Sequence, residues 1–152
     1  MDLTIKLEDA TLNIRVSILL KSKNGYIFEK NARGYLFSIG GRVKLNESFM
    51  EAAIRELKEE LLISDADFDI KLKSKAIIEN FLEMRNSEND YEHVHEICFV
   101  YEAEEVYGGL LREEYFIEVP PEDFAKHDIR PTVLLDLIND KSGEFRNVVV
   151  GK

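Results

Sequence analysis

The sequence predicts an α/β fold in which a mixed β-sheet lies between helices. A strongly periodic helix begins near Ser48, and segments with strand character lie on both sides of it. A second helical segment, ending at Ile138, completes this layered arrangement. No internal repeat and no linker rich in Gly, Ser or Pro divides the chain, so we expect one domain over residues 1–152.

The part of the chain before the central helix is predicted to be β-structure. The turn Lys23-Asn24-Gly25 is typical of a hairpin, and a second turn is expected at residues 31–34. Four segments carry the aliphatic, β-branched or aromatic residues of strands, and the last of them delivers the chain to Gly40: residues 3–6, 13–20, 26–29 and 35–39.

The central helix has a recognisable start and an apolar face. Ser48 and Glu51 have the spacing of a capping box, in which each side chain bonds a free backbone amide of the other residue. Helical spacing then predicts one apolar stripe, made of Met50, Ala53, Ile54, Leu57 and Leu61.

After this helix the pattern returns to strands and ends in helical segments. Residues 68–82, 92–104 and 115–119 are expected to be extended, with a polar turn at 86–90 and a loop at 105–114. Lys71, Lys73 and Lys75 alternate along the first of these strands and are interpreted as a solvated face. We expect a helical turn at 122–126, a helix with Pro131 in its first turn, and an edge strand at 148–150.

Composition narrows the function classes. The formal net charge of −10 argues against a nucleic acid polymer as partner, because such binding needs a basic surface. A small phosphorylated substrate stays open, since a cation can offset the repulsion locally. The single Cys98 fits a reducing compartment, and no membrane span or signal pattern is present, so the expected location is the cytoplasm. A homodimer is left open.

Three carboxylates share one flank of the predicted helix. Glu56, Glu59 and Glu60 fall on an arc beside the apolar stripe, and Arg55 lies within reach of Glu56 and Glu59. Carboxylates crowded in this way repel one another, and burial of Glu60 would add a desolvation cost. A divalent cation would relieve both, and hard oxygen ligands suit Mg²⁺, with Mn²⁺ as the alternative.

The spacing of this segment resembles the Nudix box. The matching residues are Gly41, Glu47, Arg55, Glu56, Leu57, Glu59, Glu60 and Ile63, and Gly40 matches the glycine that usually precedes the box. Ile39 stands where a proline is common, and Leu62 stands where the family has a glycine. The family glycine ends the helix, so leucine there predicts a different helix exit at a modest stability cost.

The resemblance implies a fold and a chemistry. The fold is the Nudix α/β/α sandwich, a mixed sheet with a loop–helix–loop motif. The chemistry is Mg²⁺-dependent hydrolysis, by a metal-activated water, of the pyrophosphate bond in a nucleoside diphosphate linked to another group. Glu56, Glu59 and Glu60 would hold the metal, and Arg55 would orient Glu56 or Glu59. Glu47 would brace the loop or support the metal through its ligands. Gly40 and Gly41 would allow the backbone to approach the helix start or the substrate closely.

Many relatives use a further acid outside the box, as a base or metal ligand. The candidates by position are Glu79, Glu96, Glu113 and Glu114. Glu96 is preferred, as a substrate-binding residue or metal ligand, because a charge in a strong strand requires a partner: a metal, Lys or Arg. His93 and His95 share the opposite face of that strand, but without a third ligand they do not predict zinc.

Substrate identity is predicted only by class. Members of the family that cleave ADP-ribose often carry a proline a short way past the box. No proline occurs here between Gly41 and Val119, which argues against that substrate. A base could stack on Tyr35, Phe37, Phe81 or Tyr91, and the sequence does not rank them. The alternative functions are a catalytically silent nucleotide-binding or sensing protein on the same fold, and a metal-dependent isomerase acting on a diphosphate.

Overall fold

A computed structural model describes residues 1–85, 91–103 and 111–152, which form eight strands, two α-helices and one 3₁₀-helix. The predicted turn at 86–90 and most of the loop at 105–114 lie outside the described residues. In chain order the elements are β1 (Thr4–Lys6), β2 (Ala10–Lys21), β3 (Tyr26–Lys30), β4 (Leu36–Arg42), α1 (Phe49–Leu61), β5 (Leu72–Arg85), β6 (Tyr91–Ala103), β7 (Phe116–Val119), η1 (Pro121–Lys126), α2 (Val133–Asn139) and β8 (Arg146–Val150).

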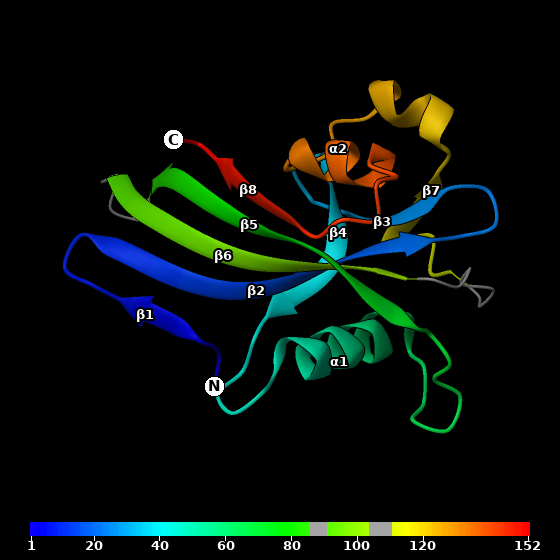
Figure 1. Cartoon of the computed structure of the whole chain (residues 1–152), viewed down its shortest axis with the longest axis horizontal. Helices are drawn as coiled ribbons and strands as arrows, with labels where there is room; N and C mark the ends of the chain where they lie inside the picture. The colour runs from blue at the N-terminus through cyan, green and yellow to red at the C-terminus, as the bar shows by residue number, and fades with distance from the viewer. Residues whose placement is uncertain (86–90, 104–110) are drawn as a thin grey trace.

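The strands form one mixed sheet, as predicted. Its order is β7-β3-β4-β2-β6-β5-β8, with β1 paired to β2. The pairs β2–β6 and β5–β8 are parallel, and the other strand pairs are antiparallel. Figure 1 shows α1 on one side of the sheet and η1 with α2 on the other, which is the predicted three-layer sandwich. The predicted edge strand at the C-terminus is confirmed as β8.

Each face of the sheet has its own apolar core, because side chains alternate along the strands. On β2, Val16, Ile18 and Leu20 pack toward α1, whereas Leu19 packs toward α2. Leu57 of α1 and Leu134 of α2 are almost fully buried in these two cores. None of the helices within the described ranges has the length and apolar content that a membrane crossing needs.

The start of α1 is as predicted, but its buried face is rotated. Ser48 accepts a hydrogen bond from the Glu51 amide, and the Glu51 carboxylate accepts one from the Ser48 amide at 2.8 Å. Met50 was predicted to belong to the apolar stripe, but it is exposed. The buried face instead runs through Ala52, Ala53, Glu56, Leu57 and Leu61.

The end of α1 contradicts the prediction of a different helix exit. Leu62 adopts the left-handed conformation, φ 54° and ψ 43°, that the glycine of the Nudix pattern would provide. Its amide and that of Ile63 both donate to the carbonyl of Lys58. The helix therefore ends in the usual way for this motif, and the β-carbon of leucine is accommodated in a disfavoured conformation.

Two further predictions are corrected. Lys75 is not on a solvated face, because a register shift between Ser74 and Ala76 turns it inward. It is buried, donates to the Asp140 carbonyl at 2.7 Å and lies 3.7 Å from the Glu102 carboxylate. Pro131 was predicted in the first turn of the last helix, but α2 begins two residues later, at Val133. The helical turn at 122–126 is confirmed within η1.

The strained exit predicts that Leu62→Gly stabilises the protein by about 0.5–1 kcal/mol. The left-handed conformation costs a β-carbon-bearing residue about 1–2 kcal/mol, and glycine returns part of this through the flexibility of the unfolded chain. Leu62 is 70% exposed, so little packing is lost. Urea unfolding measures the change. Asn46→Gly is the matched control, because asparagine tolerates its φ of 64° and should gain less. A lower stability for Leu62→Gly would contradict the account.

Candidate active site on helix α1

The loop before α1 brings a glycine against a carboxylate. Strand β4 ends in Gly40, Gly41 and Arg42, and α1 packs across this end of the strand. A β-carbon at Gly41 would overlap the carboxylate of Glu56, and one at Gly40 would overlap the carbonyl of Val16. Gly40 is therefore needed for the close approach to β2, whereas Gly41 leaves the space that the Glu56 carboxylate occupies, and a side chain there would displace that carboxylate.

Arg55 is the centre of the site's hydrogen bonds. Its Nε and Nη2 donate to the two carboxylate oxygens of Glu47, at 2.6 and 2.9 Å. Its Nη1 donates to Glu56 at 2.6 Å and to Glu59 at 3.4 Å. Nη2 also donates to the carbonyl of Arg42 at 3.0 Å. One guanidinium thus joins the loop to two of the helix carboxylates.

Glu47 is occupied by this arginine and by the loop itself. Besides its two bonds from Arg55, its carboxylate accepts the backbone amide of Lys44 at 2.8 Å. The hydrogen bonds from Arg55 lower the pKa of Glu47, and the Glu47 carboxylate in turn raises the pKa of Arg55. These contacts agree with a role in bracing the loop.

The three helix carboxylates differ in burial. Glu56 is buried, Glu60 is half-buried and Glu59 is exposed. Burial raises the pKa of Glu60, and the nearby charges of Glu56 and Glu59 raise it further, while Arg112 opposes them. The predicted crowding of carboxylates on this flank is therefore present, and together with burial it raises the pKa of Glu60.

The structure adds two residues that sequence spacing did not indicate, Glu29 and Arg112. Glu29 lies on β3, and burial and then the charges of Glu60 and Glu56 raise its pKa to about 7. Arg112 donates to the carbonyl of Glu60 and covers the ring of Phe116 at 5.6 Å. Arg112 precedes β7, and β7 pairs with β3, so only the sheet brings these two residues to α1.

The acids considered from outside the box lie elsewhere. The partner of Glu96 is Arg15 of β2, at 3.8 Å, and the alternation of β6 turns this pair toward the α2 side of the sheet. Glu113 and Glu114 are exposed, and Glu79 is half-buried on β5. His93 lies 3.6 Å from Glu83, and His95 stacks on Phe81. The structure thus gathers Gly41, Glu47 and the residues of α1, but not Glu96.

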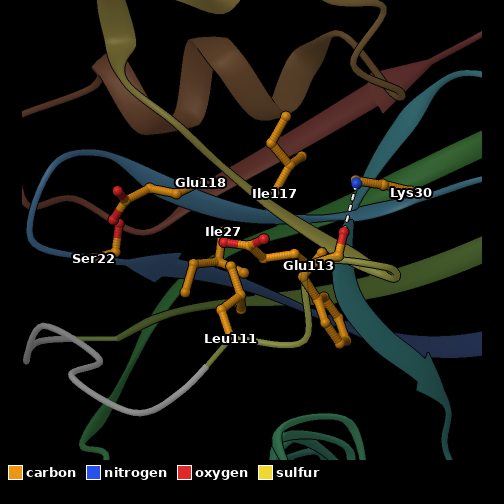
Figure 2. Close-up of a pocket in the computed structure, with 8 residues that line it drawn as sticks. Ser22, Ile27, Lys30, Leu111, Glu113, Ile117 and Glu118 are labelled. Atoms are coloured by element: carbon orange, nitrogen blue, oxygen red, sulfur yellow. Dashed lines mark hydrogen bonds between the residues drawn. The ribbon is translucent and has the colours of Figure 1, made fainter.

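Two hollows lie near this region. One, of about 440 Å³, runs along the outer side of α1 and is lined by Arg55, Lys58 and Glu59 together with Glu51, Ile54 and Asp65. The other, of about 490 Å³, lies between β3, β7 and the segment before β7 (Figure 2). There Lys30 donates to the carbonyl of Glu113 at 2.6 Å. This second hollow contains none of the helix carboxylates, so its size does not identify it as the reactive site.

The donor chemistry of the α1 flank fits a divalent cation. It consists of carboxylates, with the hard oxygens that Mg²⁺ and Mn²⁺ prefer, and like charge raises the pKa of Glu60 and Glu29 there. Across the parts of the chain that the structure describes, no three His, Cys, Asp or Glu side chains are gathered closely enough to hold an ion as they stand. Arg55 occupies the position between Glu56 and Glu59 instead.

Comparison with known proteins identifies the family. The family model described as "NUDIX domain" matches residues 12–137, which include all of β3 to β7 and all but the first two residues of β2. The chain belongs to the Nudix family. This confirms the resemblance that the box indicated and makes the protein a pyrophosphohydrolase of the Nudix type.

Solved structures of Nudix proteins share the fold. The MutT protein of Methanosarcina mazei Go1 has a TM-score of 0.61 at 19% identity, over 88% of this chain and 94% of that one. An ADP-ribose pyrophosphatase of Streptococcus suis has a TM-score of 0.56 at 13% identity, over 89% and 98%. The Ap4A hydrolase of C. elegans has 0.54 at 15%, over 84% and 94%. No match is found among curated proteins. At these identities the similarity is one of fold.

The Arg55 network predicts that Arg55→Met lowers the free energy of unfolding by about 2–3 kcal/mol. The substitution leaves the partly buried carboxylates of Glu47 and Glu56 without their cation. Arg42→Met is the matched control, because the contact of the Arg42 side chain with Asp2, at 3.9 Å, is exposed and its loss should change stability by less than about 0.5 kcal/mol. Equal unfolding midpoints for the two variants in urea would contradict this role of Arg55.

The pKa of Glu29 predicts a pH-dependent effect of Glu29→Gln. Because the pKa is raised from 4.5 to about 7, the folded protein binds more protons than the unfolded chain in this window, and stability falls as pH rises through it. Glutamine removes that loss. Relative to wild type, Glu29→Gln should therefore gain about 1 kcal/mol between pH 5 and pH 8, after allowance for solvent screening.

Urea unfolding in EDTA at the two pH values measures this effect. The pKa of Glu60 is shifted in the same direction, and the two carboxyl groups interact, so the measured difference is that of the coupled pair. A stability difference between the two proteins that does not change with pH would show that Glu29 titrates normally.

Proposed function

We propose that this Nudix protein hydrolyses the pyrophosphate bond of a nucleoside diphosphate linked to another group, and that it requires Mg²⁺. The observation that carries the proposal is the position of Arg55, which joins Glu47 of the loop to Glu56 and Glu59 of α1. A purely structural helix gains nothing from three crowded carboxylates, whereas a cation and a phosphorylated substrate would use them.

In this proposal Glu56, Glu59 and Glu60 hold the cation. A divalent cation, when bound, neutralises charge on the pyrophosphate oxygens and lowers the pKa of a coordinated water. Arg55 keeps Glu56 turned toward Gly41, and Glu47 keeps the guanidinium in place. Glu59 is exposed, so its side chain can leave its long 3.4 Å contact with Arg55 at little cost.

We also propose Glu29 as the additional acid of the site, in place of the four acids considered from the sequence. Its neighbours in the sheet are Phe37 of β4 and Phe116 of β7, and the charges of Glu60 and Glu56 act on it. A carboxyl with a pKa near neutrality can accept the proton that the attacking water loses. The products would be two phosphate-containing fragments, with the water oxygen on one of them.

A nucleotide panel assayed with Mg²⁺ and with EDTA tests the proposal. Wild type should release phosphate-containing products from at least one member, only with the cation. Glu59→Gln should lower kcat by about 100-fold or more, because a ligand of the cation is lost. Glu83→Gln, an exposed acid on the far part of β5, is the matched control and should keep full activity.

The competing functions give different results in the same assay. A silent nucleotide sensor would bind panel members without turnover in any of them. An isomerase would consume a diphosphate without cleaving it, which product analysis reveals. Turnover that persists in EDTA, or equally in Glu59→Gln, would contradict the proposed use of the α1 carboxylates.

A further inference from the structure

Two aromatic side chains lead away from the carboxylates along β4. Tyr35 and Phe37 have ring centroids 6.2 Å apart. Side-chain alternation places Phe37 on the same face of β4 as Gly41, which packs against Glu56. Glu29 lies directly opposite Phe37 on β3. These two half-buried rings and Glu29 therefore form a surface on the sheet face that α1 packs against, and the charges of Glu60 and Glu56 act on its Glu29 end.

A third residue fixes the outer end of this surface. The guanidinium of Arg130 lies 4.5 Å from the centre of the Tyr35 ring, in a cation–π contact. Asp128 accepts two hydrogen bonds from Arg130, at 3.1 and 2.8 Å. Backbone hydrogen bonds anchor the same segment to Leu36 on both sides, at 2.8 and 2.9 Å. Arg130 is thus held over Tyr35 by its own segment before any ligand arrives.

The spacing along β4 suits a nucleotide. Phe37 and Gly41 are four residues apart, which is about 13 Å along a strand. An extended nucleoside diphosphate spans a comparable distance from its base to its outer phosphate. A substrate with its pyrophosphate at Glu56 and Glu60 would therefore bring its base over Phe37.

The structure also ranks the aromatic residues that the sequence left equal. Phe81 is already stacked with His95 at 4.3 Å, and the amine of Lys152 lies over its ring. Tyr91 opens β6 next to the end of β5, where it contacts Arg85. Figure 1 shows that these ends of β5 and β6 extend away from α1. Only Tyr35 and Phe37, of the four, share the face of β4 that meets the carboxylates.

We propose that the surface formed by Phe37, Tyr35 and Arg130 binds the base of a purine nucleotide, which stacks on Phe37 beside the Arg130–Tyr35 pair. This rests on the proposed function, because it places the pyrophosphate at α1. Stacking on an aromatic ring tolerates any base and strengthens with its π surface, so purines are favoured over pyrimidines. Asp128 balances the charge of Arg130, so the contribution of Arg130 is to hold the Tyr35 ring in place.

Calorimetric binding of two non-hydrolysable ligands in Mg²⁺ tests the proposal on the full chain. The ligands are the α,β-methylene analogue of ADP, which has a base, and methylenediphosphonate, which has none. Wild type should bind the nucleotide more tightly, and Phe37→Leu should reduce this preference about tenfold without changing the affinity for methylenediphosphonate. Phe37→Trp should restore the preference.

The controls separate this inference from the proposed function. Phe81→Leu removes an aromatic ring of the same kind at the far part of β5 and should leave both affinities unchanged. If Phe37→Leu does not fold, Tyr35→Leu tests the same stacking surface. Should wild type bind both ligands while Phe37→Leu keeps the full preference, or loses affinity for both equally, the stacking surface is refuted and the cation site survives. Failure of wild type to bind either ligand would refute both.

Discussion

The site depends on one guanidinium. Arg55 makes a two-point contact with Glu47 and reaches Glu56 and Glu59 from the same side chain. Two-point contacts of arginine with a carboxylate fix orientation as well as position. The loop that contains Glu47 connects β4 to α1, so this contact ties the loop to the helix. Without it, Glu56 and Glu59 would lose the side chain that they share.

The pairing of strands in the sheet brings residues from distant parts of the chain next to the Arg55 network. Gly41 closes β4 against Glu56, while β3 and β7 bring Glu29 and the segment of Arg112 to the far end of α1. The capping box fixes where α1 begins, and Leu62 fixes where it ends. The helix therefore places Glu56 against Gly41 of β4, and Glu60 is near enough to Glu29 of β3 for its charge to act on that carboxyl.

The sequence predicted the parts of this arrangement that depend on local spacing. The capping box, the Nudix box and the alternation of β6 each involve residues that are near neighbours in the chain. Glu29 and Arg112 could not be found in this way, because strand pairing alone brings β3 and β7 next to α1. Lys75 was predicted on the wrong face because a bulge in β5 turns its side chain inward. The helix exit was predicted wrongly because Leu62 adopts the left-handed conformation that usually requires glycine. Glu96 was given weight for its charge, which Arg15 balances.

The central claim is that the carboxylates of α1 form a cation site in which Arg55 orients Glu56 and Glu59. The most direct measurement is a titration with Mn²⁺ followed by electron paramagnetic resonance, on wild type and on Glu56→Gln and Glu60→Gln. Wild type should bind the ion, Mg²⁺ should compete for it, and each variant should weaken binding by about tenfold or more. Equal Mn²⁺ affinity in all three proteins would contradict the claim.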